Sequence, residues 1–390
     1  MAPARAQAAV FEVALRDGRV WAASALSGDS VRGFEVTTDG ARRHVDADDL
    51  LAVHAAVAQI VELPSCHFPE GDVVRGQIVG GDANGDHVEV LSPVLGRLVL
   101  PIDRLAAIAA AGQRDPLRLR LPEGVDEAIF LRAVIGYDLL AGALHHCGER
   151  GLAFAPDGAE APRWFGPQDF LALRIADPAP RRRPVRAWLS TRLGDRLAVT
   201  LRRWSEAAVQ VGLDAVPAGS TIVDLRPADV ASLTFAAAGT FASDLEPVEV
   251  VESGFDAAVL HPWQRDRAAV GTPLVAGGRT HDKGLGVHAR SRLVFRAPAD
   301  ATHFWTRVGL DDSSVALGVA ADVDVRVLVD GKVRFEANGL RAGRPRDAGR
   351  IEVAPGQLVA LEVDFGAGRD IGDRVDWLSP VFLPAAGRRP

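Results

Sequence analysis

The sequence predicts an all-β chain in which four small β-barrel-like or curled-sheet repeats precede an antiparallel β-sandwich. Apolar and polar residues alternate in short runs, and Gly, Asn, Asp and Pro interrupt these runs every few residues. A period of two is typical of strands with one buried face, and the interrupting residues favour turns. After Phe255 the alternating runs become longer, which indicates a change from repeats to a sandwich.

One pattern recurs four times before the sandwich. Each unit opens with a strand that carries a Gly/Asp turn and closes with an aspartate followed by an apolar run. The spacing along the chain between the opening and the closing aspartate is nearly equal in all four units. Short strands in units of this length are typical of small barrels or curled sheets. The openings are Asp17-Gly18, Gly71-Asp72, Gly136-Tyr137-Asp138 and Gly194-Asp195, and the closing residues are Asp49, Asp103, Asp169 and Asp229.

The four units are expected at residues 10–62, 63–115, 116–180 and 184–245. Six apolar residues between Asp46 and Glu62 recur at helical spacing, which predicts a connector helix between the first two units. Several short strand-rich units leave strand edges that need partners, so we also expect self-association into a homo-oligomer. The residues of the expected helix face are Leu50, Leu51, Val53, Val57, Ile60 and Val61.

Charge and hydropathy exclude two classes of partner. The 390-residue chain carries a net charge of −7, so it has no basic field that would attract nucleic acid or an anionic membrane. No apolar run approaches the roughly 18 residues that a membrane-spanning helix needs. The small residues of MAPARAQAA fit either the region after a removed secretion signal or an ordinary chain terminus.

Cys66 and Cys147 are the only cysteines, too few for a disulfide scaffold. Each has a histidine neighbour, His67 or His146, so a zinc site is one interpretation. Adjacent residues on a strand point to opposite faces, which makes two ligands from one dipeptide awkward. A disulfide and a pair of free buried thiols are the alternatives, and the free thiols are favoured.

Strand alternation is clearest in the last third of the chain. Val323, Val325, Val327 and Val329 alternate with polar or charged residues, and Asp330-Gly331 then predicts a two-residue hairpin turn. The segment RIEVAPGQLVALEVDF repeats this arrangement. Strands of this kind predict an antiparallel sandwich with one wet face on each sheet.

Four segments of this region occur in an order that resembles the NPCBM family, whose name denotes a carbohydrate-binding module. They are WQRDRAAVGTPLVAGGRTHDKGLGVHARSRLVF, FWTRVGLDD, VRVLVDGKVRF and DIGDRVDWLSPVFL, and the resemblance covers about residues 255–383. It implies a galactose-binding-like jelly-roll sandwich and the binding of a glycan. Members are commonly attached to glycoside hydrolases, and some bind galactose-type sugars.

The loops of the sandwich supply the candidate binding residues, because recognition sites are commonly placed on loops at one end of such a scaffold. An exposed tryptophan gives a sugar ring a flat face for stacking, and charged side chains exchange hydrogen bonds with its hydroxyls. The resemblance predicts Trp377 in the core, and His288, which a strand follows, is interpreted as structural. The candidates for carbohydrate binding are Trp263, Arg265, His281, Lys283, Trp305, Asp311 and Asp312.

The sandwich also offers residues that could hold a structural calcium ion. Asp311 and Asp312 follow a strand, and Asp373 and Asp376 approach the last one, so the four could offer the oxygen ligands that calcium prefers. Solvated or turn-capping aspartates are the favoured alternative.

The sequence is compatible with three functions. The sequence has no strand–helix alternation of a barrel hydrolase and no G-x-S-x-G, H-E-x-x-H or P-loop motif. We therefore expect a non-catalytic protein that binds neutral glycans and is secreted or placed at the cell surface or in the periplasm. A structural or assembly protein is the alternative, and a glycoside hydrolase is the least favoured.

Overall fold

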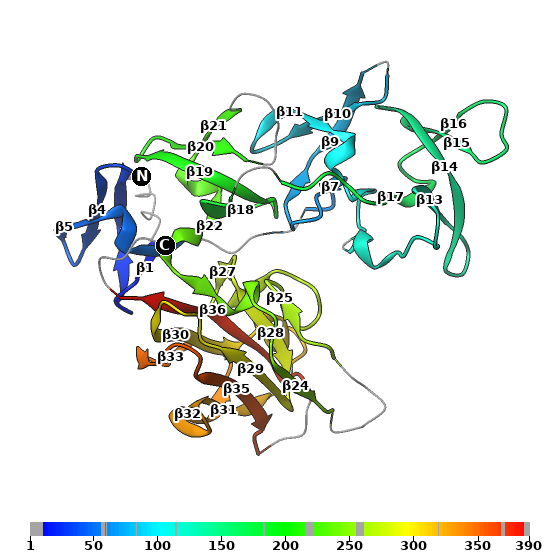
Figure 1. Cartoon of the computed structure of the whole chain (residues 1–390). Coiled ribbons are helices and arrows are strands. Elements are labelled where there is room, and N and C mark those ends of the chain that lie inside the picture. Colours follow the sequence, from blue (N-terminus) through cyan, green and yellow to red (C-terminus); the bar gives the residue numbers. More distant parts are fainter. Residues whose placement is uncertain are drawn as a thin grey trace, which may run out of the picture. The chain divides into compact units, whose positions relative to one another are not determined.

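A computed structural model describes residues 11–55, 59, 61–82, 84–113, 115–181, 184–214, 221–254, 261–318, 320–367 and 371–385. Strands dominate these residues, and the one α-helix among them is the four-residue α1 (Asp312–Val315). This confirms the predicted all-β fold class (Figure 1). The chain forms two compact units, one of residues 1–58 and 230–390 and the other of residues 59–229.

The first compact unit begins with a small curled sheet. Its first strand, β1, pairs with β2 and β6, while β3, β4 and β5 follow as a meander. A later strand, β22, returns to pair with β6. The bounds are β1 (Phe11–Leu15), β2 (Val20–Ala23), β3 (Ala25–Asp29), β4 (Gly33–Thr38), β5 (Ala41–Val45), β6 (Leu50–His54) and β22 (Val230–Phe235).

The predicted connector helix is wrong over its first half. A 3₁₀ turn, η1 (Ala47–Asp49), is followed by strand β6, and all five residues of β6 are buried. This strand lies between β1 and β22, so side chains on both of its faces are covered. A strand buried on both faces loses its polar alternation and cannot be told from a helix by periodicity alone. Val57 and Ile60 lie outside the described residues.

The second compact unit repeats this strand pattern. In its first half β7 pairs with β8 and β12, and β9, β10 and β11 form a meander. Next, β13 pairs with β14 and β17, and β14, β15 and β16 follow in order. Finally β18, β19, β20 and β21 pair in succession. The bounds are β7 (Ser65–His67), β8 (Val73–Arg75), β9 (Gln77–Gly81), β10 (His87–Ser92), β11 (Gly96–Pro101), β12 (Ala107–Ala109), β13 (Glu127–Arg132), β14 (Tyr137–Gly148), β15 (Gly151–Pro156), β16 (Arg163–Phe165), β17 (Phe170–Ile175), β18 (Ala187–Thr191), β19 (Arg196–Trp204), β20 (Val209–Leu213) and β21 (Ile222–Leu225).

A shared hydrogen bond accounts for the regular aspartate spacing. The backbone carbonyls of Asp49, Asp169 and Asp229 each accept an N–H from the strand end just before an opening turn, at 2.8 to 2.9 Å. The donors are Arg16, Arg132 and Arg192. In the remaining repeat the corresponding position is Pro69, which has no N–H to donate.

The C-terminal sandwich has two sheets. One has the strand order β25-β28-β36-β30-β33, with β23 added on β36 and β34 on β30; the other has the order β24-β29-β35-β31-β32. A small hairpin, β26–β27, lies beside them in sequence. The bounds are β23 (Thr240–Phe241), β24 (Glu249–Glu252), β25 (Gln264–Arg265), β26 (Leu274–Ala276), β27 (Arg279–His281), β28 (Gly284–His288), β29 (Ser291–Arg296), β30 (Ala301–Leu310), β31 (Asp322–Val329), β32 (Lys332–Arg341), β33 (Arg346–Asp347), β34 (Ile351–Glu352), β35 (Leu358–Phe365) and β36 (Arg374–Pro384).

The core between these sheets follows the predicted alternation. All four alternating valines of β31 belong to it, and Trp377 is fully buried there, as predicted. The hairpin turn also forms where it was expected: Val329 pairs with Lys332, and both Asp330 and Gly331 have positive φ. Positive φ at both central residues is the geometry of the tight turn that matches strand twist.

The curled N-terminal sheet packs on the outer face of the sandwich sheet that contains β30 and β36. Trp305 on β30 lies in an apolar cluster with residues of β1 and β6, whereas its neighbour Phe304 points into the sandwich core. The two side chains alternate as predicted, but the outward one is covered by protein. The cluster consists of Ala14, Leu51, Ala52, Ala238, Phe241, Trp305, Val381 and Leu383.

Candidate functional site

The site that the geometry favours lies at one end of the sandwich. Strand pairing places Glu252 opposite Ser291 and His288 opposite Arg374, so the end of β24, the loop after β28 and the start of β36 meet at this end. The end of β35 joins them because Ser291 pairs with Val363. Loops gathered at the end of a rigid sandwich are a common place for ligand recognition.

Two histidines stack at this end. The ring centroids of His261 and His288 are 4.5 Å apart and their planes differ by 26°. His261 is exposed and His288 is half-buried. Nδ1 of His288 lies 2.9 Å from the carbonyl oxygen of Ala289. A carbonyl only accepts, so Nδ1 carries the proton in the neutral ring and Nε2 is the acceptor.

An arginine–carboxylate pair joins the loop after β28 to the end of β35. Nε and Nη2 of Arg290 donate to the two carboxylate oxygens of Asp364, at 2.9 and 3.3 Å. Burial alone would raise the pKa of the Asp364 carboxyl, but the hydrogen bonds and positive charge of Arg290 hold it below its usual value. The Arg290 guanidinium also lies 5.5 Å from the centroid of the Phe365 ring.

We call His261, His288, Arg290, Asp364 and Phe365 the loop-end cluster. The side chains of Arg290 and Asp364 are 55% and 37% exposed, so solvent reaches this pair. A guanidinium has five N–H donors, of which the carboxylate binds two here. Planar rings beside charged donors and acceptors are the groups that bind the flat faces and the hydroxyls of a sugar.

The prediction that Trp305 contacts sugar is corrected by its position in the structure. Its side chain is 1% exposed, and its Nε1 donates to Asp347 at 3.0 Å. The N-terminal strands cover the ring, so it cannot stack on a ligand. The sequence could not reveal this, because the covering residues Ala14 and Leu51 belong to the first repeat, far from Trp305 along the chain.

The predicted sugar contacts of His281 and Lys283 are corrected as well, because both side chains are buried. The Lys283 ammonium donates to Asp244 at 2.6 Å and to Asp266 at 2.7 Å, which makes it a structural clamp. The ring of His281 stacks on that of His54, with centroids 4.1 Å apart. The glycine-rich segment that contains them is the β26–β27 hairpin and strand β28, not an open loop.

Trp263 and Arg265 are half-buried near the loop-end cluster. The Trp263 ring packs against the sandwich core, and the Arg265 guanidinium lies 4.8 Å from its centroid. Nη1 of Arg265 donates to the backbone oxygens of Ser243 and Leu245, at 2.8 and 2.5 Å. Protein groups therefore engage both side chains, which stay half-buried, and a sugar contact by either one remains a prediction.

The aspartates serve as caps. Asp311 accepts from the backbone N–H of Ser313 at 2.9 Å, and Asp312 accepts from Gly277 and Gly278 at 3.0 and 2.8 Å. These bonds fit the turn-capping alternative. Asp311 is buried, which argues against its predicted sugar contact, whereas the sugar contact of half-buried Asp312 remains a prediction.

The four aspartates of the calcium prediction lie in different surroundings, and the calcium ion itself remains a prediction. Burial first, and then the nearby Asp311 carboxylate, raise the pKa of Asp376 well above its usual value. Asp373 is buried as well. Within the described residues, no group of three or more His, Cys, Asp and Glu side chains is arranged to hold a metal ion.

Cys66 and Cys147 are free and buried, which is the favoured one of the three interpretations. Burial raises the pKa of the Cys66 thiol far above its usual value and that of Cys147 to about 12. Separately, no helix in the described residues is long and apolar enough to cross a membrane.

The loop-end cluster was missed by sequence reasoning. His261, His288 and Asp364 are well separated from one another along the chain. Only the pairing of β28 with β36 and of β29 with β35 brings these loops together. The strand that follows His288 predicts a structural histidine, and no local signal distinguishes that role from a ligand-binding one.

Comparison with known proteins gives a curated relative. A protein of Renibacterium salmoninarum named "Putative endo-alpha-N-acetylgalactosaminidase" is 26% identical over 157 residues, which are 39% of this chain. The matched region spans only 10% of the length of that relative.

Two solved structures are also similar. One is CBM51 from Clostridium perfringens GH95 in complex with methyl-galactose, with 22% identity, a TM-score of 0.32, and coverage of 36% of this chain and 97% of that one. The other holds the CBM51-2 and INT domains of Clostridium perfringens ZmpB, with 22% identity, a TM-score of 0.34, and coverage of 47% and 38%.

The family comparison matches residues 239–383 to the NPCBM/NEW2 domain. The match begins at residue 239, earlier than the predicted start at residue 255, and thereby includes β23, which pairs with β36. Residues 239–383 of this chain therefore match the NPCBM/NEW2 domain, the family that the sequence motifs indicated.

Proposed function

We propose that this chain is a non-catalytic, secreted or cell-surface protein that binds neutral glycans through the loop-end cluster. The observation that carries the proposal is the placement of stacked imidazoles beside a solvent-accessible Arg290–Asp364 pair in a domain of a carbohydrate-binding family. Galactose-type sugars, including N-acetylgalactosamine, are the first candidates, because the curated relative is named for N-acetylgalactosamine.

The expected affinity is modest. A few exposed hydrogen bonds and one stacking surface correspond to dissociation constants from micromolar to millimolar, about −8 to −4 kcal/mol. A hydrogen bond from a charged donor contributes about 1.5–3 kcal/mol, so loss of the Arg290 guanidinium should weaken binding at least about tenfold.

The test is a titration of the full chain with methyl galactoside and with N-acetylgalactosamine. Binding is measured by calorimetry or from chemical-shift changes. Arg290→Ala should weaken binding at least about tenfold. Arg97→Ala is the matched control, because the exposed Arg97 also pairs with a carboxylate, Glu89 at 2.5 Å, but in the other compact unit. Equal effects of the two substitutions would contradict the proposed site, and release of reducing sugar from a glycan would contradict a non-catalytic role.

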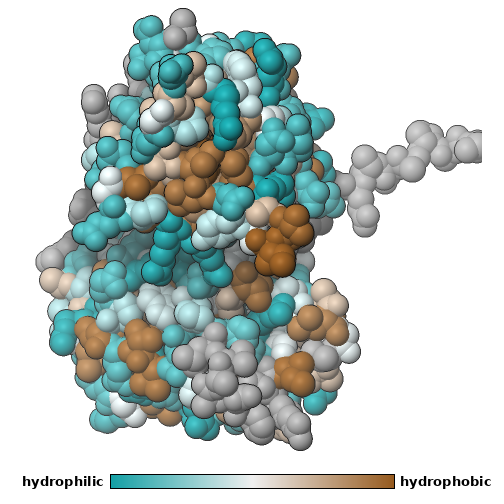
Figure 2. Space-filling view, turned by 90° about the vertical axis from the view of Figure 1, so that its right-hand side faces the viewer, coloured by the Kyte–Doolittle hydropathy of each residue, from teal (hydrophilic) through white to brown (hydrophobic). Residues whose placement is uncertain are grey.

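Self-association is a second candidate, favoured by one observation. Val134 and Ile135, in the turn between β13 and β14, are 104% and 91% exposed, and Tyr137 is also exposed. Figure 2, which views the molecule from the side where β13–β16 lie in Figure 1, shows hydrophobic residues gathered at the surface. Light scattering that shows a larger species, reduced to a monomer by Val134→Ser with Ile135→Ser, would support this function. A monomer at tens of micromolar would contradict it.

A further inference from the structure

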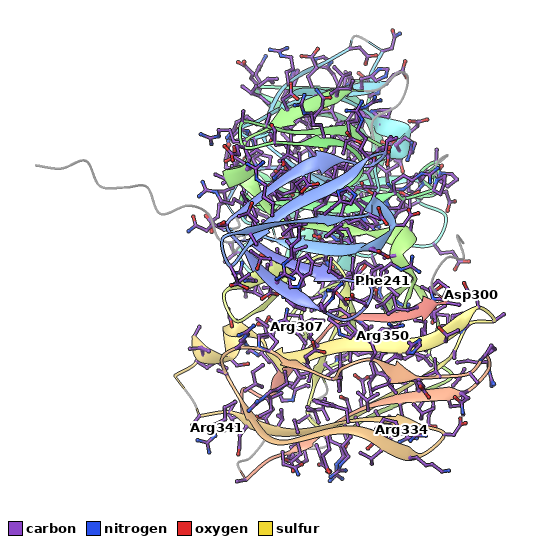
Figure 3. All side chains as sticks on the ribbon, turned by 90° about the vertical axis from the view of Figure 1, so that its left-hand side faces the viewer. Phe241, Asp300, Arg307, Arg334, Arg341 and Arg350 are labelled. Carbon is purple, nitrogen blue, oxygen red and sulfur yellow. The ribbon has the colours of Figure 1, made fainter. Side chains whose placement is uncertain are left out.

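A buried cluster of charged and titratable groups joins the N-terminal sheet to the NPCBM/NEW2 domain within the first compact unit. It consists of Glu12 on β1, His54 on β6, Arg279 and His281 on β27, and Arg307 on β30; we call it the imidazole cluster. Four of the five are buried and Arg279 is half-buried. Figure 3 labels Arg307 where the blue N-terminal strands meet the yellow strands of the domain.

The two imidazoles are in direct contact. Their ring centroids are 4.1 Å apart and the planes differ by 47°. Nδ1 of His54 lies 3.0 Å from the carbonyl oxygen of Thr280, which only accepts, so this nitrogen carries the proton of the neutral ring. Neither ring nitrogen of His281 has a hydrogen-bond partner among the described residues.

The charges around the rings do not compensate an added proton. Glu12 forms a hydrogen-bonded ion pair with Arg307, and its other oxygen lies 3.7 Å from Nε of Arg279. Nη1 of Arg279 donates to the backbone oxygen of His54 at 3.0 Å. Two guanidinium groups therefore face one carboxylate, so a protonated imidazole would add a third cation next to the two arginines.

A further carboxylate nearby is already engaged. Asp282, the neighbour of His281, is buried and accepts a hydrogen bond from the Thr234 hydroxyl of β22 at 3.1 Å. This bond directs the Asp282 carboxylate toward β22. The cluster thus fits two neutral histidines better than a charged one.

We propose that the imidazole cluster is an acid-sensitive latch: protonation of His54 and His281 loosens the packing of strands β1 and β6 on the NPCBM/NEW2 domain. The apolar cluster around Trp305, which shares this interface, does not titrate. Acid therefore weakens the packing progressively, while the sandwich core remains folded. This inference is independent of glycan binding, because it involves none of the loop-end residues.

The direction and the magnitude of the pH effect follow from the surroundings of the two imidazole rings. Burial, more than the adjacent arginines, lowers the pKa of His54 from 6.5 to about 4, and burial lowers that of His281 well below its usual value. The loosened state therefore takes up protons first as the pH falls below about 6.5, and the docked state loses stability until about pH 4. From His54 alone, the loosened state is favoured about 20-fold more at pH 5 than at pH 7.

The test is amide hydrogen exchange of the full chain at pH 7, 6 and 5, with intrinsic exchange rates corrected for pH. Peptides from β1, β6 and β27 should exchange about 20-fold faster at pH 5 than at pH 7. Peptides from β31 and β35, in the other sheet of the sandwich, serve as the internal reference and should not change. A uniform change in both sets, or no change in β1, β6 and β27, would overturn the proposal.

Variants identify the titrating groups. His281→Phe keeps a ring that can stack but cannot bind a proton, and His54→Gln supplies an amide that can donate to the Thr280 carbonyl. The double variant should show no acid-dependent increase in exchange, and His145→Gln, an exposed histidine of the other compact unit, should behave as the unaltered chain. If the double variant does not fold, His281→Phe alone should reduce the increase. An unchanged increase in that variant would overturn the role of the stacked pair.

Discussion

Replacing Trp305 with alanine should destabilise the first compact unit strongly and should leave glycan binding intact in the molecules that remain folded. The ring is buried between β30 and the N-terminal strands, and its Nε1 donates to Asp347. Truncation of a buried tryptophan costs about 3–5 kcal/mol, which includes the cavity left behind. The lost hydrogen bond accounts for about 1 kcal/mol of such a change.

The assay is unfolding in urea, monitored by the fluorescence emission of the other tryptophans. Trp305→Phe is the matched variant. Phenylalanine keeps part of the apolar contact but removes the N–H and the other atoms of the five-membered ring, so it should cost less than alanine, about 1–2 kcal/mol. If Trp305→Ala abolished binding of a sugar while changing the free energy of unfolding by less than about 1 kcal/mol, Trp305 would be the exposed platform and the packing described here would be wrong.

Two further predictions concern buried polar groups. Lys283→Met should lower the free energy of unfolding by about 2–4 kcal/mol, because it leaves Asp266 largely buried without its cation; a calorimetric change below about 0.5 kcal/mol would contradict the clamp. Cys66 and Cys147 should not react with a thiol reagent at pH 8 until the chain is unfolded, since burial raises both pKa values and blocks access. Rapid labelling of the native chain would show that at least one thiol is accessible.

Local patterns predicted the parts of the fold that local interactions determine. The alternation from Val323 to Val329 places one face in a core, and Asp330-Gly331 permits the positive φ of a tight turn. The aspartate repeat likewise reflects a hydrogen bond that forms inside three of the four repeats. The spacing in β6 predicts a helix wrongly, because its neighbours, β1 and β22, come from opposite ends of the repeat region and bury both of its faces.

The candidate site was less predictable because it depends on contacts between distant segments. The residue types chosen from the sequence were suitable for sugars, but Trp305, His281 and Lys283 are covered by segments far away in the chain or paired with them. Conversely, Arg290 and Asp364 come together only through the pairing of β29 with β35. A sequence shows which chemistry is available, whereas strand pairing decides which of it reaches solvent.

The most direct test of the central claim is the effect of a galactose-type sugar on the imidazole resonances of His261 and His288 in the full chain. If the loop-end cluster is the binding site, saturating sugar should shift both sets of resonances, and Arg290→Ala should require at least about ten times more sugar for the same shift. The resonances of His44, an exposed histidine of β5, should remain unchanged. Binding that leaves His261 and His288 unshifted would contradict the assignment of the site.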